Sequence, residues 1–290
     1  MHHRGQDAVL TPPRRADGPT RRCDLDVIRG SFRMTESSIV AKGSDAAQVT
    51  PGAGRAAELE ASLSALLQRI DAACAAAGRP AGAVRLLPVT KFHPASDIEI
   101  LYHLGRREFG ESREQEAAAK VAQLSQLSQI RWEFIGRLQR NKAKSVARWA
   151  DTVYSVDSDR LASALDAGTR AALDEGARTT PLRVLLQVSL DADPERGGVR
   201  DAALHALADQ VAASESLQLA GLMAIPPLDV EPDAAFEQLA RIHAALTTVH
   251  PEAIELSAGM SGDLESAIRH GSTCVRVGTA LMGARPITSA

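Results

Sequence analysis

Short apolar segments alternate with helix-length segments along most of this chain, and that alternation constrains the fold more than any other feature. An amphipathic segment, Arg55 to Ala77, comes first, and Gly78 follows it as a C-terminal cap. The rhythm that follows is typical of repeated βαβ units, so we predict an α/β fold: a single (β/α)8 barrel, with a doubly wound open sheet as the alternative. The eight predicted strands are Val84–Val89, Arg107–Phe109, Trp132–Ile135, Thr152–Val156, Val184–Leu190, Leu217–Ile225, Ile254–Leu256 and Val275–Leu281.

Helical spacing of apolar residues predicts helices between these strands. They include Ala95–Leu104, Glu114–Leu127, Asn141–Ala150, Asp201–Ala213, Pro232–Val249 and Ser261–His270. Aromatic residues make up only 3% of the chain, which leaves the barrel interior to aliphatic side chains. We expect residues 55–290 to form one domain.

Residues 1–54 have no sustained periodicity and are predicted to be a disordered N-terminal extension. Arg14-Arg15 is not followed by the apolar run that a twin-arginine export signal requires. The codon for Met34 is an alternative start to that for Met1.

Charge, apolar runs and the spacing of cysteine and histidine argue against nucleic-acid, membrane and metal binding. The 290 residues carry a formal net charge of -3, which favours neither nucleic acid nor an anionic membrane as the main partner. No run approaches the roughly 18 apolar residues of a membrane helix. Cys23, Cys74 and Cys274 lack the spacing of a zinc site, so we expect a cytoplasmic protein without a metal. His93 and His103 likewise have no partners at metal-ligand spacing.

Polar or glycine-containing clusters lie directly after the predicted strands. Because a barrel carries its chemistry at the carboxyl ends of its strands, we expect these clusters to converge on one mouth. They are Thr90-Lys91, Gly110 to Ser112, Gly136 to Asn141, Asp157, Ser257 to Ser261 and Arg276 to Thr279.

Lys91 ends the first apolar run and would point into that mouth. Desolvation there lowers the pKa of an amine and frees its lone pair for reaction with an aldehyde. The alternative is a lysine at a strand end that reaches into solvent. Glu111 and Glu116 could serve as general acids or bases, but we interpret them as helix-terminal or solvated charges.

The seventh and eighth strands are followed by small and hydroxylated residues of the kind that hold a phosphate. Gly259, Ser261 and Gly262 form a strand-to-helix turn, although Ser261 could simply cap the helix. Gly278-Thr279 follows the eighth strand, and barrels often build a phosphate site from these two loops. Arg276 alternates with apolar residues in that strand; it could donate a hydrogen bond to a pyridine nitrogen or form an internal salt bridge.

Several motifs together resemble the pyridoxal phosphate homeostasis protein family (YggS/PROSC type), which is similar to the alanine racemase N-terminal domain. The resemblance extends from about Arg55 to Arg285. The motifs are Val89–Lys91, Phe109–Glu116, Trp132–Lys142, Gly221–Pro226, Gly259–Ser261 and Gly271–Arg285.

This resemblance implies a barrel of fold type III that binds pyridoxal 5'-phosphate (PLP) and takes part in vitamin B6 homeostasis. Lys91 would hold the PLP aldehyde as a Schiff base, and Arg276 would face the pyridine nitrogen. The phosphate would contact Ser261, Gly278 and Thr279, and the pocket would be lined by Met223, Ser257 and Met260. Ser112 stands where the family has a longer Asn close to the cofactor ring, so its side chain reaches less far toward the ring.

Three hypotheses about function follow. The first is a monomeric PLP carrier that serves PLP-dependent apoenzymes and has no established turnover, since a racemase draws a second base from a further domain. The second is an amino-acid racemase that pairs Lys91 with Tyr102, Tyr154 or a cysteine. The third is an interaction module without a cofactor. Arg137 and Arg140, in a motif where the family is variable, add positive charge that could attract an anionic ligand or partner.

Overall fold

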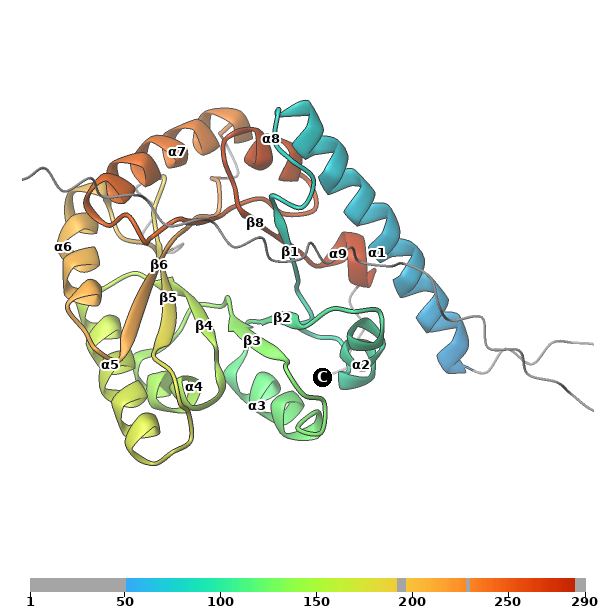
Figure 1. The fold of residues 1–290 in the computed structure, drawn as a ribbon, viewed down its shortest axis with the longest axis horizontal. Coiled ribbons are helices and arrows are strands. Elements are labelled where there is room, and N and C mark those ends of the chain that lie inside the picture. The colour runs from blue at the N-terminus through green and yellow to red at the C-terminus, as the bar shows by residue number, and fades with distance from the viewer. Residues whose placement is uncertain (1–50, 192–196, 228–229, 285–290) are drawn as a thin grey trace, which may run out of the picture. The chain divides into compact units, whose positions relative to one another are not determined.

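The chain is described here from a computed structural model that covers residues 51–191, 197–227 and 230–284. Parallel strands surround a central axis and helices cover them from outside (Figure 1). The strands are β1 Arg85–Pro88, β2 Glu108–Glu111, β3 Arg131–Phe134, β4 Thr152–Val156, β5 Leu182–Gln187, β6 Leu217–Met223, β7 Glu255–Ser257 and β8 Cys274–Val277. The helices are α1 Pro51–Ala76, α2 Ala95–His103, α3 Glu114–Gln123, the short 3-10 helix η1 Arg140–Lys142, α4 Ala143–Trp149, α5 Asp159–Asp174, α6 Asp201–Ala212, α7 Pro232–Val249, α8 Leu264–Arg269 and α9 Thr279–Met282.

The eight strands form one sheet that closes on itself. Their order is β1-β8-β7-β6-β5-β4-β3-β2, and every pair is parallel. Beyond the end of β1, Val89 pairs with Gly110 of β2, and the Thr90 amide donates to the Gly110 carbonyl at 3.0 Å. The barrel prediction is therefore confirmed, and the open-sheet alternative is wrong.

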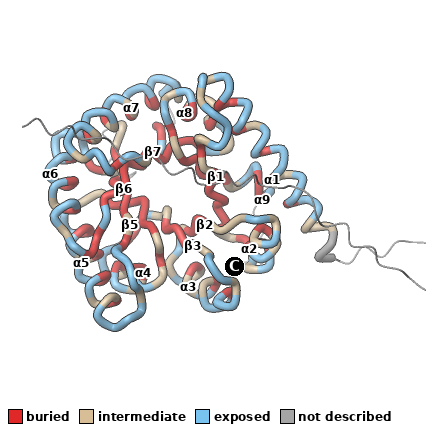
Figure 2. Tube along the Cα trace, viewed as in Figure 1, coloured by how far each residue is buried: buried red, intermediate tan, exposed pale blue. Residues whose placement is uncertain are grey.

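Apolar side chains from several strands pack together inside the barrel. Leu87, Tyr154, Leu185, Met223 and Cys274, from five different strands, form one buried cluster with Ala220. The outward faces of the strands pack against the helices, and Figure 2 shows the buried residues concentrated along the strands. Aliphatic residues dominate the interior as predicted, with Tyr154 as the aromatic exception.

Helix α1 lies against the outside of the barrel beside α8 and α9 (Figure 1). Leu59, Leu63, Leu66 and Ile70 repeat at helical spacing on its buried face. They share one apolar cluster with residues of α8, β8 and α9, namely Leu264, Ile268, Val275, Val277, Leu281 and Met282. The helix begins at Pro51, before the predicted start at Arg55.

Most element ends differ from the predicted ranges by a few residues, and three differences near the C-terminus or between β4 and β5 bear on the site or on what the sequence can predict. Strand β8 ends at Val277 and not at Leu281, because the amides of Leu281 and Met282 both turn back to the Gly278 carbonyl and start α9. Helix α8 begins at Leu264, so Ser261 is not its cap. Helix α5 was not singled out, although Leu161 and Leu165 on its buried face have helical spacing.

Residues 1–50, the greater part of the expected N-terminal extension, lie outside the described residues. Within 51–191, 197–227 and 230–284, no helix combines the length and apolar character needed to cross a membrane.

Candidate functional site

The carboxyl ends of the strands meet at one mouth, and Lys91 lies there in a tight turn directly after β1. The amide of His93 donates to the Thr90 carbonyl at 3.1 Å, which closes the turn around Lys91 and Phe92. Lys91 is half-buried and Thr90 fully buried. The backbone turn therefore places Lys91 at the mouth, with its side chain partly shielded from solvent.

Arg276 lies near the carboxyl end of β8 and is only 5% exposed. Its Nη1 donates to Ser257 Oγ at 2.7 Å, and its Nη2 donates to the Ala224 carbonyl at 3.0 Å. Within the described part of the chain, no carboxylate lies within ion-pair distance of this guanidinium. Desolvation lowers the pKa of Arg276. The internal salt bridge considered from the sequence is thus replaced by bonds to neutral oxygens.

The loops after β7 and β8 lie next to each other. Ser261 Oγ accepts a hydrogen bond from the Ala280 amide, in the first turn of α9, at 3.3 Å. A Cβ built on Gly278 would lie 3.6 Å from the Val89 carbonyl, so the start of α9 also lies beside the end of β1. The hydroxyl and amide donors expected to hold a phosphate, at Ser261, Gly278 and Thr279, are therefore gathered on one side of the mouth.

Helix α1 fixes both of these loops from outside. Arg69 Nη1 donates to the Ser261 carbonyl at 2.8 Å, while its Nη2 donates to Glu265 at 2.7 Å. Arg55 Nη2 donates to the Met282 carbonyl at 2.8 Å and to Asp97 at 2.7 Å. Neither arginine could be predicted as a contact of the mouth, because nothing in the α1 sequence indicates which loops the helix contacts.

The remaining predicted pocket residues are spread more widely. Met223, at the end of β6, is 1% exposed and belongs to the barrel interior. Met260 is 38% exposed and lines a side cavity of about 460 Å³ together with Ile225 and Val230. Ser112 lines a separate, larger cavity. Ser257 contacts Arg276 directly, but the described contacts do not bring Ser112 or Met260 to that pair.

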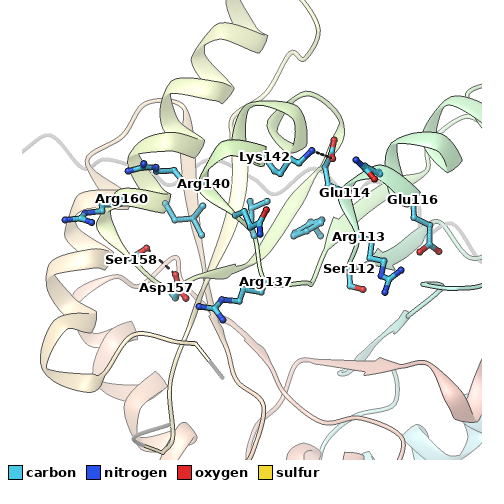
Figure 3. Close-up of a pocket in the computed structure, with 15 residues that line it drawn as sticks. Ser112, Arg113, Glu114, Glu116, Arg137, Arg140, Lys142, Asp157, Ser158 and Arg160 are labelled. Atoms are coloured by element: carbon cyan, nitrogen blue, oxygen red, sulfur yellow. Dashed lines mark hydrogen bonds and ion pairs between the residues drawn. The ribbon is translucent and has the colours of Figure 1, made fainter. Parts of the chain in front are cut away.

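The larger cavity, about 1090 Å³, lies over the ends of β2, β3 and β4 (Figure 3). Phe134, Leu138 and Leu161 give it an apolar lining. Its cationic side chains come from several loops and helices: Arg113, Arg137, Arg140, Lys142 and Arg160. Lys142 is paired with Glu114 at 3.3 Å, so part of this charge is neutralised within the cavity.

The burial and contacts of Glu111 and Glu116 differ from the helix-terminal or solvated charges that the sequence suggested. Glu111 is fully buried, not solvated, and accepts hydrogen bonds from Thr90 Oγ1 and Lys120 Nζ, both at 2.7 Å. Glu116 lies in the first turn of α3 as expected, but its Oε1 accepts the Phe92 amide at 2.6 Å. Lys120 was also missed, although it lies four positions after Glu116, a spacing that brings two side chains together on a helix.

The donor set of the mouth fits a ligand with one anionic end and one neutral acceptor. A buried cation bonded only to neutral oxygens carries an uncompensated desolvation cost, which an acceptor on a ligand would offset. The Ser261 and α9 donors suit a phosphate, and Lys91 follows β1 at the same mouth with an amine that can react with an aldehyde. These residues can therefore hold a phosphorylated heterocycle that bears an aldehyde.

Comparison with known proteins adds independent evidence. The alanine racemase N-terminal domain model matches residues 61–286. The pyridoxal phosphate homeostasis protein of Mycobacterium tuberculosis is 52% identical over 256 residues, which cover 84% of this chain and 99% of that protein.

Solved structures show the same barrel. PipY of Synechococcus elongatus, with PLP bound, has 36% identity and a TM-score of 0.67 over 78% of this chain and 100% of that one. Alanine racemase of Corynebacterium glutamicum is 16% identical with a TM-score of 0.58, and covers 82% of this chain and 63% of that one. The racemase likeness shows a shared fold only.

Proposed function

The chain belongs to the pyridoxal phosphate homeostasis family, and on that premise we propose that it binds PLP at the barrel mouth and takes part in intracellular vitamin B6 homeostasis. The observation that carries this proposal is the buried Arg276, whose described partners are neutral oxygens and which lies in the same mouth as Lys91. When bound, PLP supplies an aldehyde that an amine can hold reversibly and a ring that can accept electrons.

Each part of PLP has a candidate partner. Lys91 would hold the aldehyde carbon covalently through its amine, as a Schiff base. Ser261, Gly278 and Thr279 would bind the phosphate, and the adjacency of their two loops supports this assignment. Arg276 would donate to the pyridine nitrogen and leave it without a proton, which weakens the ring as an electron sink.

We propose a carrier that holds PLP without turnover of amino acids. A racemase needs a second acid or base opposite the lysine, and both tyrosines lie elsewhere. Tyr154 is buried in the barrel, where its hydroxyl contacts Arg85 and Glu133. Tyr102, on α2, donates to the Ser128 carbonyl at 3.1 Å. Cys274 is also interior, and burial raises the pKa of its thiol to about 11.

PLP-dependent apoenzymes are the recipients that we propose, with the chain acting as a monomer in the cytoplasm. The buried free thiols of Cys74 and Cys274 support a reducing compartment. Size-exclusion chromatography with light scattering tests the monomer. Transfer of PLP from the loaded protein to a purified apoenzyme, followed by recovery of that enzyme's activity, tests the recipient.

Borohydride trapping tests the proposal as a whole. The protein is incubated with PLP, the visible absorbance band is recorded, and the reduced adduct is located by peptide mass mapping. We expect one pyridoxyl group on Lys91 and none in Lys91→Ala, while exposed Lys144→Ala behaves as wild type. An adduct on another lysine, or none, contradicts the proposal. Amino-acid racemisation that disappears in Lys91→Ala would instead support the racemase.

A further inference from the structure

Phe92, the residue after Lys91, has a backbone conformation that L-residues rarely adopt. Its φ is 67°, and the only other non-glycine residue of the described chain with a positive φ is Gln129, at 66°. Phe92 is the third residue of the turn that the Thr90 carbonyl and the His93 amide close. A positive φ at that position is typical of a type II turn, where glycine or asparagine is usual. A bulky aromatic residue there is strained and needs support from its surroundings.

That support comes from β2 and α3. The Phe92 amide donates to Glu116 Oε1 at 2.6 Å. The Thr90 hydroxyl donates to Glu111 Oε1 at 2.7 Å, and the Thr90 carbonyl accepts from Lys120 Nζ at 2.9 Å. The turn is thus bonded on both sides of Lys91.

The three supporting side chains also hold one another. Lys120 Nζ lies 2.7 Å from both Glu111 Oε1 and Glu116 Oε1. Lys120 is 5% exposed and Glu111 fully buried, so these bonds form where competition from water is weak. The Arg113 guanidinium lies 4.6 Å from the centre of the Phe92 ring and adds a cation–π contact.

We infer that Glu111, Glu116 and Lys120 are positioning residues that hold the Phe92 turn in its strained form and thereby aim Lys91 into the mouth. The inference rests on the proposed function of Lys91. With Phe92 in an ordinary negative-φ conformation, the chain direction at Lys91 would change, because the two residues share one turn. Bonds to the turn backbone therefore act on the direction in which the lysine amine points.

The inference has a specific consequence for Phe92→Gly. Glycine adopts a positive φ without a steric penalty. Removal of the Glu116 carboxylate should therefore weaken PLP retention strongly when residue 92 is Phe, and much less when it is Gly. A role of Glu116 in general stability alone would give the same loss in both backgrounds.

The test is a double-mutant cycle on the PLP-loaded full chain, with the dissociation rate of PLP followed by loss of the visible band. We expect Glu116→Ala to speed dissociation about tenfold in the wild-type background, within the range set by the strain of one residue. In the Phe92→Gly background the same substitution should change the rate by less than about threefold. Lys144→Ala is the matched control and should retain PLP as wild type does.

The result that overturns the inference is an equal effect of Glu116→Ala in both backgrounds, or no effect in either. Thermal unfolding and circular dichroism verify that each variant is folded. If Glu116→Ala does not fold, Glu116→Leu carries the same cycle, since leucine also lacks an acceptor for the Phe92 amide and favours the helix that Glu116 occupies. Absence of the visible band in the wild-type protein would refute the proposed function itself, an outcome distinct from those above.

Discussion

Arg85 and Arg276 lie on the neighbouring strands β1 and β8 and both reach into the barrel, yet the two ends of the barrel surround them with opposite chemistry. Arg85, at the amino end, contacts Glu133 at 2.9 Å, Glu255 at 3.1 Å and the Tyr154 hydroxyl at 2.8 Å, and also pairs with Glu108. Arg276, at the carboxyl end, contacts only a serine hydroxyl and a backbone carbonyl in the described chain.

The pKa shifts follow from this difference. Burial lowers the pKa of Arg276, because few negative groups oppose its desolvation. Burial alone would lower the pKa of Arg85 as well, but the acidic groups that surround this arginine outweigh the effect of burial and raise its pKa. The buried charges at the amino end are therefore compensated by side chains of the chain itself, which close that end of the barrel. At the carboxyl end, by contrast, the buried charge of Arg276 is stabilised when an acceptor binds from outside.

The largest effect should come from Arg85→Met. Loss of this cation leaves Glu108, Glu133 and Glu255 close together at the amino end, and breaking a buried ion pair in this way costs about 3 to 5 kcal/mol. Chemical denaturation of the protein without PLP measures this loss of unfolding free energy. Arg183→Met is the matched control, since Arg183 also pairs with Glu255 but is 38% exposed. Equal losses in the two variants would show that the amino end is not a closed network.

Glu133→Gln tests the charge network at the amino end through the pH dependence of the unfolding free energy. Burial raises the pKa of Glu133 from 4.5 to about 7, although Arg85 opposes the shift. Between these values the folded chain keeps a proton that the unfolded chain releases, so Glu133 contributes stability below pH 4.5 that is lost as the pH rises to about 7. One pKa unit corresponds to about 1.4 kcal/mol, so the loss can reach about 3 kcal/mol.

Glutamine does not titrate. The unfolding free energy of wild type relative to Glu133→Gln should therefore fall as the pH rises through this window, as measured by urea unfolding at several pH values. Glu108 titrates outside the window, because Arg85 and Arg131 hold its pKa below 4.5 against the effect of its burial. A constant difference between the two proteins would contradict the assignment to Glu133.

In contrast to Arg85→Met, Arg276→Leu should weaken PLP binding and leave the unfolding free energy almost unchanged. The unfolding free energy without PLP should stay within about 1 kcal/mol of wild type, because the lost hydrogen bonds are offset by relief of a buried charge. PLP should bind about 10 to 100-fold more weakly, the usual worth of a hydrogen bond from a charged donor. Titration of the visible band measures affinity, with exposed Arg269→Leu as the control. A stability loss as large as that of Arg85→Met would make Arg276 a structural residue.

The same contrast explains what the sequence could predict. The eight strands, and the place of Arg276 in the last of them, could be predicted because hydrophobic periodicity and strand ends are local signals. The contacts of Arg85 with Glu133 and Glu255 were not found, since they join residues 48 and 170 positions apart. The roles of Glu111 and Lys120 were missed for a related reason. Their burial depends on how α3 packs over β2, and a charged residue in isolation is normally solvated.

The smallest effect should come from Arg69→Met, which loosens the mouth from outside. Arg69 and Glu265 are 36% and 45% exposed, so their ion pair should contribute less than about 1 kcal/mol to folding. The hydrogen bond of Arg69 to the Ser261 carbonyl, however, holds a loop expected to bind phosphate. We therefore expect PLP to dissociate about two to threefold faster with little change in unfolding free energy, because one part-buried hydrogen bond to the loop is lost. Arg170→Met, which removes the surface pair with Asp166, should change neither quantity. If both substitutions leave the dissociation rate unchanged, α1 stabilises the barrel without any influence on the mouth.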